Sequence, residues 1–116
     1  MAAEINYASA DDFAGDDAYE VNEIDVRLSR GRTVRVRGLS RLELMHGGKG
    51  TDDSAEIERR MIVDALVTPR MTLKQIEAWQ KKPGSIVDIG KVTTAIRNLS
   101  GLGKGADKSD LAEISQ

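Results

Sequence analysis

Residues 20–37 alternate between apolar and polar positions, and the alternation is interrupted by Ser29-Arg30-Gly31-Arg32. A period of two with β-branched residues, on both sides of a turn that contains Gly, predicts a β-hairpin. An isolated hairpin is only marginally stable, so its apolar face is expected to cover helices. The apolar positions are Ile24, Val26, Leu28, Val34 and Val36.

The register of this hairpin is predicted by placing its aliphatic side chains together on one face. That condition puts Val26 near Val36 and Leu28 near Val34. The same register places Asp25 opposite Arg37 on the outer face, where the opposite charges would form a favourable cross-strand pair.

From Ser40 onward the apolar residues recur at the three- and four-residue intervals of helices. Four helices are expected, each opened by a side chain that can cap its first turn and by Asp, Glu or Gln three residues later. The pairs are Ser40 with Glu43, Asp53 with Glu56, Thr72 with Gln75, and Ser85 with Asp88. The expected stops are residues 46–50, Pro69, Lys82-Pro83-Gly84 and Gly101.

The apolar stripes of the helices predict which side chains face the core. The second helix offers Ile57, Met61, Ile62, Ala65 and Leu66, the third Leu73, Ile76 and Trp79, and the fourth Ile86, Ile89, Val92, Ile96 and Leu99. Together the patterns predict an α+β fold in which an N-terminal β-hairpin packs on a small bundle of about four helices.

The chain of 116 residues fits one domain, with polar segments at both ends. Residues 1–20 contain six acids and no Lys or Arg, which predicts a mobile acidic arm over residues 1–19. The globular domain is expected over residues 20–102, followed by a flexible polar tail over residues 103–116. The acids of the arm segment are Glu4, Asp11, Asp12, Asp16, Asp17 and Glu20.

Composition removes several classes of function. The chain has no Cys, which excludes disulfides, thiol catalysis and thiolate metal sites. No apolar run approaches the roughly 20 residues that cross a bilayer, and the first residues lack the basic and apolar stretches of a secretory signal. No membrane association is therefore expected, and the expected compartment is the cytoplasm.

Two glycine-rich segments and one His resemble parts of ligand-binding sites but lack the neighbouring residues that those sites require. Residues 47–51 lack the hydroxyl residue that must follow Gly-Lys in a phosphate loop, and residues 101–106 follow a predicted helix where a dinucleotide site needs a strand. His46, the single His, has no partners at metal-ligand spacing. We expect no catalytic residue, no metal and no cofactor.

Arginines crowd the hairpin and its exit, and no acid lies between Asp25 and Glu43. Three interpretations are open: a surface for an anionic partner, a solvated outer face balanced by Glu23 and Asp25, or a docking place for the chain's own acidic arm. The pI of 5.4 and the absence of nearby aromatics argue against nucleic acid. The candidate partner-binding residues are Arg27, Arg30, Arg32, Arg35, Arg37 and Arg41.

The order of motifs over residues 20–101 resembles that of tail assembly chaperones of siphovirus-type phages and prophages. An arginine-rich strand leads into the helix start Leu39-Ser40-Arg41-Leu42-Glu43. A helix then ends in Val67-Thr68-Pro69, followed by the helix start Thr72-Leu73, and the last helix closes on Ile96-Arg97-Asn98-Leu99-Ser100-Gly101-Leu102. The acidic arm has no counterpart in this resemblance.

The resemblance implies a non-catalytic protein that binds the long tape-measure protein and helps to recruit tail-tube subunits while the tail is assembled. It implies action in the host bacterial cytoplasm and absence from the mature virion. Self-association is compatible with this role. The alternatives are a structural virion or connector protein and, less well supported, a small nucleic-acid-binding regulator that uses the arginine-rich hairpin.

Overall fold

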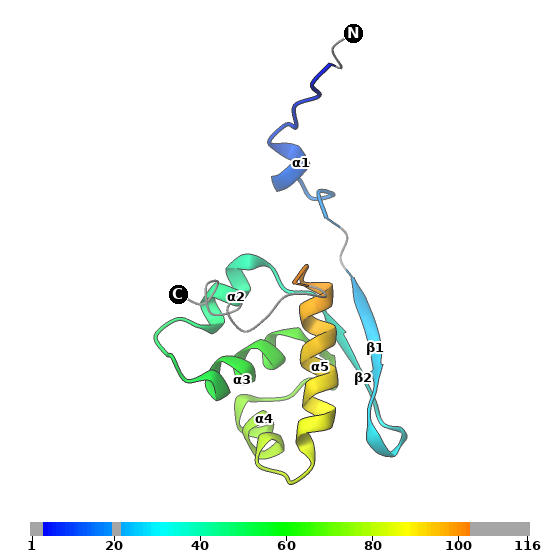
Figure 1. The fold of residues 1–116 in the computed structure, drawn as a ribbon, viewed down its shortest axis with the longest axis vertical. Coiled ribbons are helices and arrows are strands. Elements are labelled where there is room, and N and C mark those ends of the chain that lie inside the picture. Colours follow the sequence, from blue (N-terminus) through cyan, green and yellow to red (C-terminus); the bar gives the residue numbers. More distant parts are fainter. Residues whose placement is uncertain (1–3, 20–21, 103–116) are drawn as a thin grey trace.

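A computed structural model describes residues 4–19 and 22–102 of the chain, and the predicted tail at residues 103–116 lies outside these. The elements are α1 (Asp11–Ala14), β1 (Glu23–Arg27), a 3-10 turn (Ser29–Gly31), β2 (Thr33–Arg37), α2 (Arg41–Gly47), α3 (Ser54–Ala65), β3 (Leu66–Thr68), α4 (Leu73–Gln80) and α5 (Ser85–Leu99). The predicted α+β class is confirmed. In Figure 1, α5 lies between the hairpin on one side and α2, α3 and α4 on the other. The segment that contains α1 leads away from the helices and the sheet.

The hairpin forms as predicted, but its register differs by two residues. Val26 pairs with Val34, and Asp25 pairs with Arg35, so the predicted pairs of Val26 with Val36 and Asp25 with Arg37 are wrong. The turn decides the register. Its backbone closes with the Leu28 N–H donating to the Arg32 carbonyl at 2.7 Å, which leaves only residues 29–31 in the connection.

That short connection depends on two residues with positive φ. Arg30 has φ 58° and Gly31 has φ 69°. Tight hairpin turns favour this left-handed backbone because it matches the twist of the flanking strands. Gly adopts it freely, whereas Arg does so less readily. The predicted register was chosen only to bring the aliphatic side chains to one face, and a shift of two residues leaves them on that face, so the criterion could not separate the two registers.

A third strand was not predicted. The stripe of α3 was expected to continue as helix towards Pro69, but α3 ends at Ala65 and the next three residues pair with β2. The sheet order is β1-β2-β3, and Leu66 lies opposite Val36. Leu66 is 1% exposed, so its side chain lies in the core although it belongs to a strand. A helix would also have buried it, and apolar periodicity therefore could not distinguish a strand from a helix at this position.

Two of the predicted capping boxes are confirmed. Ser40 with Glu43 caps α2 and Thr72 with Gln75 caps α4, each with both reciprocal hydrogen bonds. Asp53 caps α3 as predicted, but through the N–H of Ala55 and without the reciprocal bond.

The predicted cap of α5 is wrong and lies one residue too late. The N-cap of α5 is Gly84, with φ 83° and no side-chain cap, so Ser85 and Asp88 do not form the expected pair. The predicted stop is confirmed. Gly101, with φ 87°, donates its N–H to Asn98, and Leu102 donates to Arg97, which is the hydrogen-bond pattern of a Schellman motif.

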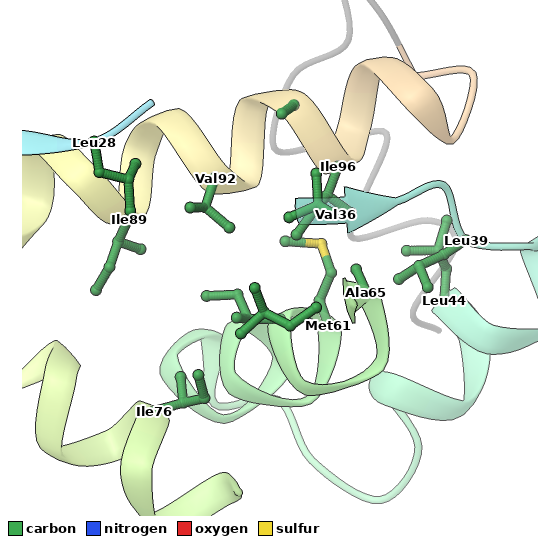
Figure 2. Packing of buried hydrophobic residues seen from close by; sticks show 13 residues of the cluster. Leu28, Val36, Leu39, Leu44, Met61, Ala65, Ile76, Ile89, Val92 and Ile96 are labelled. Carbon is green, nitrogen blue, oxygen red and sulfur yellow. The ribbon is translucent and has the colours of Figure 1, made fainter. Parts of the chain in front are cut away.

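The core lies between the sheet, α5 and the other helices, as Figure 2 shows. In Figure 2, Leu28 of the hairpin and Ile89 of α5 are drawn at one end of the core, Val36 and Ile96 further along, and Leu39 and Leu44 at the other end. The buried apolar residues are Leu28, Val36, Leu39, Leu44, Met61, Ile62, Ala65, Leu66, Ile76, Ile89, Val92, Ala95 and Ile96.

Several residues expected in the core are not buried there, among them Ile24, Ile57 and Leu99. Ile86 is 81% exposed and Leu73 is 48% exposed, while Trp79 is partly buried against the core. Ile86 is exposed because, at about 100° per residue, it lies roughly 120° around α5 from the buried Val92. Among residues 4–19 and 22–102, no helix is both long and apolar enough to cross a membrane.

Candidate protein-binding surface

Arg35 is held on the outer face of the sheet by two acids of β1. Its Nε donates to Glu23 Oε1 and its Nη1 to Asp25 Oδ1, both at 2.9 Å. These hydrogen bonds raise the pKa of Arg35 above its usual value, the one from Glu23 contributing most. At Arg35, the structure therefore agrees with the interpretation of the arginines as an outer face whose charge is balanced by Glu23 and Asp25.

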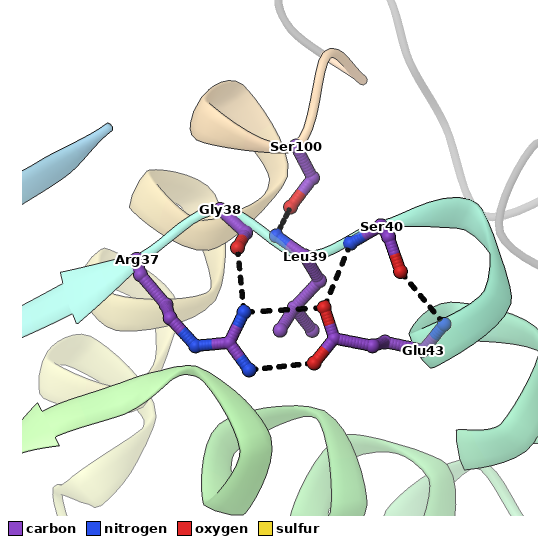
Figure 3. Close-up of polar contacts among 6 residues, drawn as sticks. All are labelled: Arg37, Gly38, Leu39, Ser40, Glu43 and Ser100. Carbon is purple, nitrogen blue, oxygen red and sulfur yellow. Dashed lines mark hydrogen bonds and ion pairs between the residues drawn. The ribbon is translucent and has the colours of Figure 1, made fainter. Parts of the chain in front are cut away.

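Arg37 joins β2 to α2 (Figure 3). Its guanidinium donates a hydrogen bond to each carboxylate oxygen of Glu43, at 3.1 and 2.5 Å, and a third to the Gly38 carbonyl at 3.1 Å. Glu43 also accepts from the Ser40 N–H at 3.0 Å. The hydrogen bond from Arg37 is the largest cause of a pKa of about 2 for Glu43. The guanidinium of Arg37 is therefore engaged in internal hydrogen bonds that connect β2 with α2.

Arg32 belongs to a third polar cluster, between the hairpin turn and α5. Asp88 is buried, at 6% exposure, and accepts from the Ser29 N–H at 3.0 Å and from Ser29 Oγ at 2.7 Å. Arg32 Nη2 lies 3.5 Å from the same carboxylate. The bonds from Ser29 are the main reason that the pKa of Asp88 is lowered. Asp88 thus fastens the turn to α5.

Sequence reasoning missed this role of Asp88, although one signal pointed to it. Asp88 precedes Val92 and Ile96 at intervals of four, in line with the apolar stripe of α5. A carboxylate on a buried stripe needs partners, because burying an unpaired charge is costly. Its partner, Ser29, is 59 residues away in sequence, so spacing alone could not identify it.

The side chains of the other three candidate arginines face solvent. Arg27, Arg30 and Arg41 are exposed, and no hydrogen bond or ion pair joins the guanidinium group of any of them to the part of the chain that the structure describes. The six predicted arginines therefore divide into three that hold the fold together and three whose guanidinium groups are available to a partner.

A shallow groove runs between β1 and α5, and we call it the edge groove. Ile24 of β1, 41% exposed, and Val87 of α5, 59% exposed, line it together with Val26 and Ala95. Arg27 and Lys91 also line it. Within the described sheet β1 pairs only with β2, so its other edge is open beside this groove.

A second groove, which we call the tryptophan groove, lies between the hairpin turn and α4 and shares no residue with the first. Its apolar lining includes Leu28, Val34, Met71 and Trp79. Three cationic side chains, Arg32, Arg70 and Lys82, line it as well. Among the described residues of the lining, the single acid is Asp88, and it is already bonded to Ser29.

In the described part of the chain no three His, Cys, Asp or Glu side chains are grouped so that they could hold a metal ion, and His46 lies exposed in the last turn of α2. Comparisons with protein-family models, curated proteins and solved structures find no match to this chain. Interpretation of function thus depends on the two grooves and the three unpaired arginines.

Proposed function

We propose that this protein is a non-catalytic tail assembly chaperone that binds the tape-measure protein and helps to recruit tail-tube subunits. The order of sequence motifs over residues 20–101 supports the role. The proposed binding surface is the edge groove. There Ile24 and Val87 expose apolar side chains beside the edge of β1, which no other strand pairs with among the described residues.

The edge groove suits a polypeptide ligand. An open strand edge offers backbone N–H and C=O groups to an added strand, and an apolar groove beside a helix accepts the apolar face of a partner segment. Two cations, Arg27 and Lys91, line the same groove with one acid, Asp25, and this excess of positive charge would favour acidic residues at the borders of that segment. Arg30 and Arg41 offer further cationic contacts outside it.

The internal pairing refines the role proposed for the arginine cluster. Arg32, Arg35 and Arg37 act in this proposal by holding the hairpin in shape, because their guanidinium groups already have acidic partners. Arg27, Arg30 and Arg41 are then the arginines that touch the partner. The proposal does not require nucleic acid, and loss of binding to the tape-measure protein is its direct readout.

The test is co-expression of the chain with the tape-measure protein, followed by affinity capture. Val87→Asp places a charge in the edge groove and is expected to reduce capture at least about tenfold, as removal of a central contact does. Ile86→Asp is the matched control, because Ile86 is the adjacent exposed apolar residue of α5 and lines a different groove. An Asp in this first turn is compatible with the helix dipole.

Equal capture by the Val87→Asp variant and the wild type would reject the edge groove as the binding surface. Recovery of the chain from purified virions by mass spectrometry would instead identify a structural virion or connector protein. Salt-dependent binding to DNA would support the nucleic-acid alternative.

A further inference from the structure

The tryptophan groove combines an apolar floor with an excess of positive charge. Arg32, Arg70 and Lys82 contribute three cations, and Asp88 contributes one anion whose oxygens accept from Ser29. Arg70 and Lys82 are exposed and have no polar side-chain partner among the described residues. A ligand for this groove would carry negative charge next to a large apolar side chain.

The acidic arm of the same chain has that chemistry. Its described residues 4–19 contain five acids and no base. Its large apolar side chains have no cover: Ile5, Tyr7, Phe13 and Tyr19 are 71%, 82%, 64% and 72% exposed. In α1 the carboxylates of Asp11 and Asp12 directly precede the ring of Phe13, and no residue of that helix is buried.

The outer face of the hairpin is a poorer site for this arm. Arg35 and Arg37 already hold Glu23, Asp25 and Glu43, so an incoming carboxylate would have to displace an internal partner. The tryptophan groove requires no such exchange at Arg70 or Lys82. It also provides an aromatic surface, Trp79, against which a Phe ring can pack.

The arm of one copy does not lie over its own groove. It leads away from the helices (Figure 1), and it joins β1 at the end opposite the turn that borders the groove. The five residues of β1 alone separate these ends by about 16 Å, at roughly 3.3 Å per residue. A neighbouring molecule can offer its arm without this reversal of direction.

We propose that the acidic arm of a second copy of this chain docks in the tryptophan groove, with Phe13 against Trp79 and its aspartates beside Arg70 and Lys82. This self-association goes beyond the proposed chaperone role and holds or fails independently of it, because the two grooves share no residue.

A mixing experiment with three full-length variants tests this. The arm variant, Phe13→Ala, keeps the groove and the only Trp of the chain, Trp79. The groove variant carries Arg70→Glu, Lys82→Glu and Trp79→Phe, so it keeps the arm and does not fluoresce as Trp. The control variant combines all four substitutions and has neither binding partner intact.

Titrating the groove variant into a dilute, fixed concentration of the arm variant is expected to shift Trp79 emission to shorter wavelength, with saturation. The control variant is expected to cause no shift. Raising the salt from about 0.05 to 0.5 M should weaken the apparent affinity at least about tenfold, because solvent-exposed charges are screened.

Two results would overturn the proposal. Absence of any shift with the groove variant means that the arm does not dock between copies. A wild-type emission that is unchanged on dilution but altered at every concentration by Phe13→Ala means that the arm covers its own groove. Sedimentation of the wild type over the same concentrations separates these results, since only docking between copies changes its mass.

Discussion

At the residue scale, the most strongly held charges join separate elements of the fold. Asp88 ties the hairpin turn to α5 through Ser29, and Glu43 ties α2 to β2 through Arg37. Both carboxylates have pKa values below their usual range because they accept hydrogen bonds in the folded chain. A carboxylate whose pKa is lowered on folding stabilises the fold only while it is ionised.

Glu43→Gln tests this linkage. The folded pKa of about 2 lies below the usual 4.5, so the stabilising effect of Glu43 is present above about pH 4.5 and disappears as the pH falls towards 2. Gln can still accept from the Ser40 N–H but carries no charge for Arg37. We expect a loss of about 1 kcal/mol at pH 7, limited by solvent screening, and almost none near pH 2.

Denaturant unfolding at several pH values measures the effect, and α4 supplies the control. Its capping box uses Thr72 and the uncharged Gln75, so Thr72→Ala is expected to cost about 1 kcal/mol at every pH. A Glu43→Gln loss that stays constant from pH 7 to pH 2 would contradict the proposed role of the charge.

At the element scale, the end of β2 and the end of α5 come unusually close. A Cβ at Gly38 would lie 2.6 Å from the Leu99 carbonyl oxygen. Beside it, Ser100 Oγ accepts from the Leu39 N–H at 2.8 Å and donates to the Ile96 carbonyl at 2.6 Å, as Figure 3 shows for the first of these bonds. The contact therefore requires a residue without a side chain at position 38.

Gly38→Ala and Gly90→Ala should change stability in opposite directions. Gly38→Ala is expected to lower the free energy of unfolding by about 1–3 kcal/mol, because backbone must move to admit the methyl group. Gly90 lies inside α5 with nothing within 4 Å of the place that a methyl group would take, so Gly90→Ala should stabilise by up to about 1 kcal/mol through helix propensity. Urea unfolding of both variants checks this, and a neutral Gly38→Ala would refute the close contact.

At the scale of the whole molecule, the described residues of the acidic N-terminal segment, residues 1–19, all lie outside the core. Residues 1–19 contain five acids and no base, and their removal changes the formal net charge from −2 to +3. No described residue of this segment is buried, whereas all the core residues lie between Leu28 and Ile96. The arm is therefore separable from the core in both respects.

Deletion of residues 1–19 is expected to leave the free energy of unfolding of the dilute protein within about 0.5 kcal/mol of the wild type, as surface changes do. The shortened chain is also expected to bind a cation exchanger at neutral pH more tightly than the full chain, because its formal net charge is +3 instead of −2. Thermal unfolding at low protein concentration provides the measurement. A loss above about 1 kcal/mol would mean that the arm contributes to the fold of its own copy.

The sequence by itself determined most of the helix boundaries after Ser40. Ser40, Thr72 and Gly101 were identified correctly because a cap is made by neighbours within one helical turn. The alternation in residues 20–37 determined the hairpin and its inward face, and the clustering of arginines marked the candidate surface. These features depend on contacts between residues close in the chain.

Only the tertiary structure decided the hairpin register, the third strand and the division of the arginines into paired and unpaired groups. Asp25 meets Arg35 because the turn closes after three residues, and Asp88 meets Ser29 because α5 packs beside that turn. The tryptophan groove likewise joins Leu28 to Lys82, which lie far apart in sequence. Periodicity records which face of an element is apolar, but it carries no information about which distant residue lies opposite.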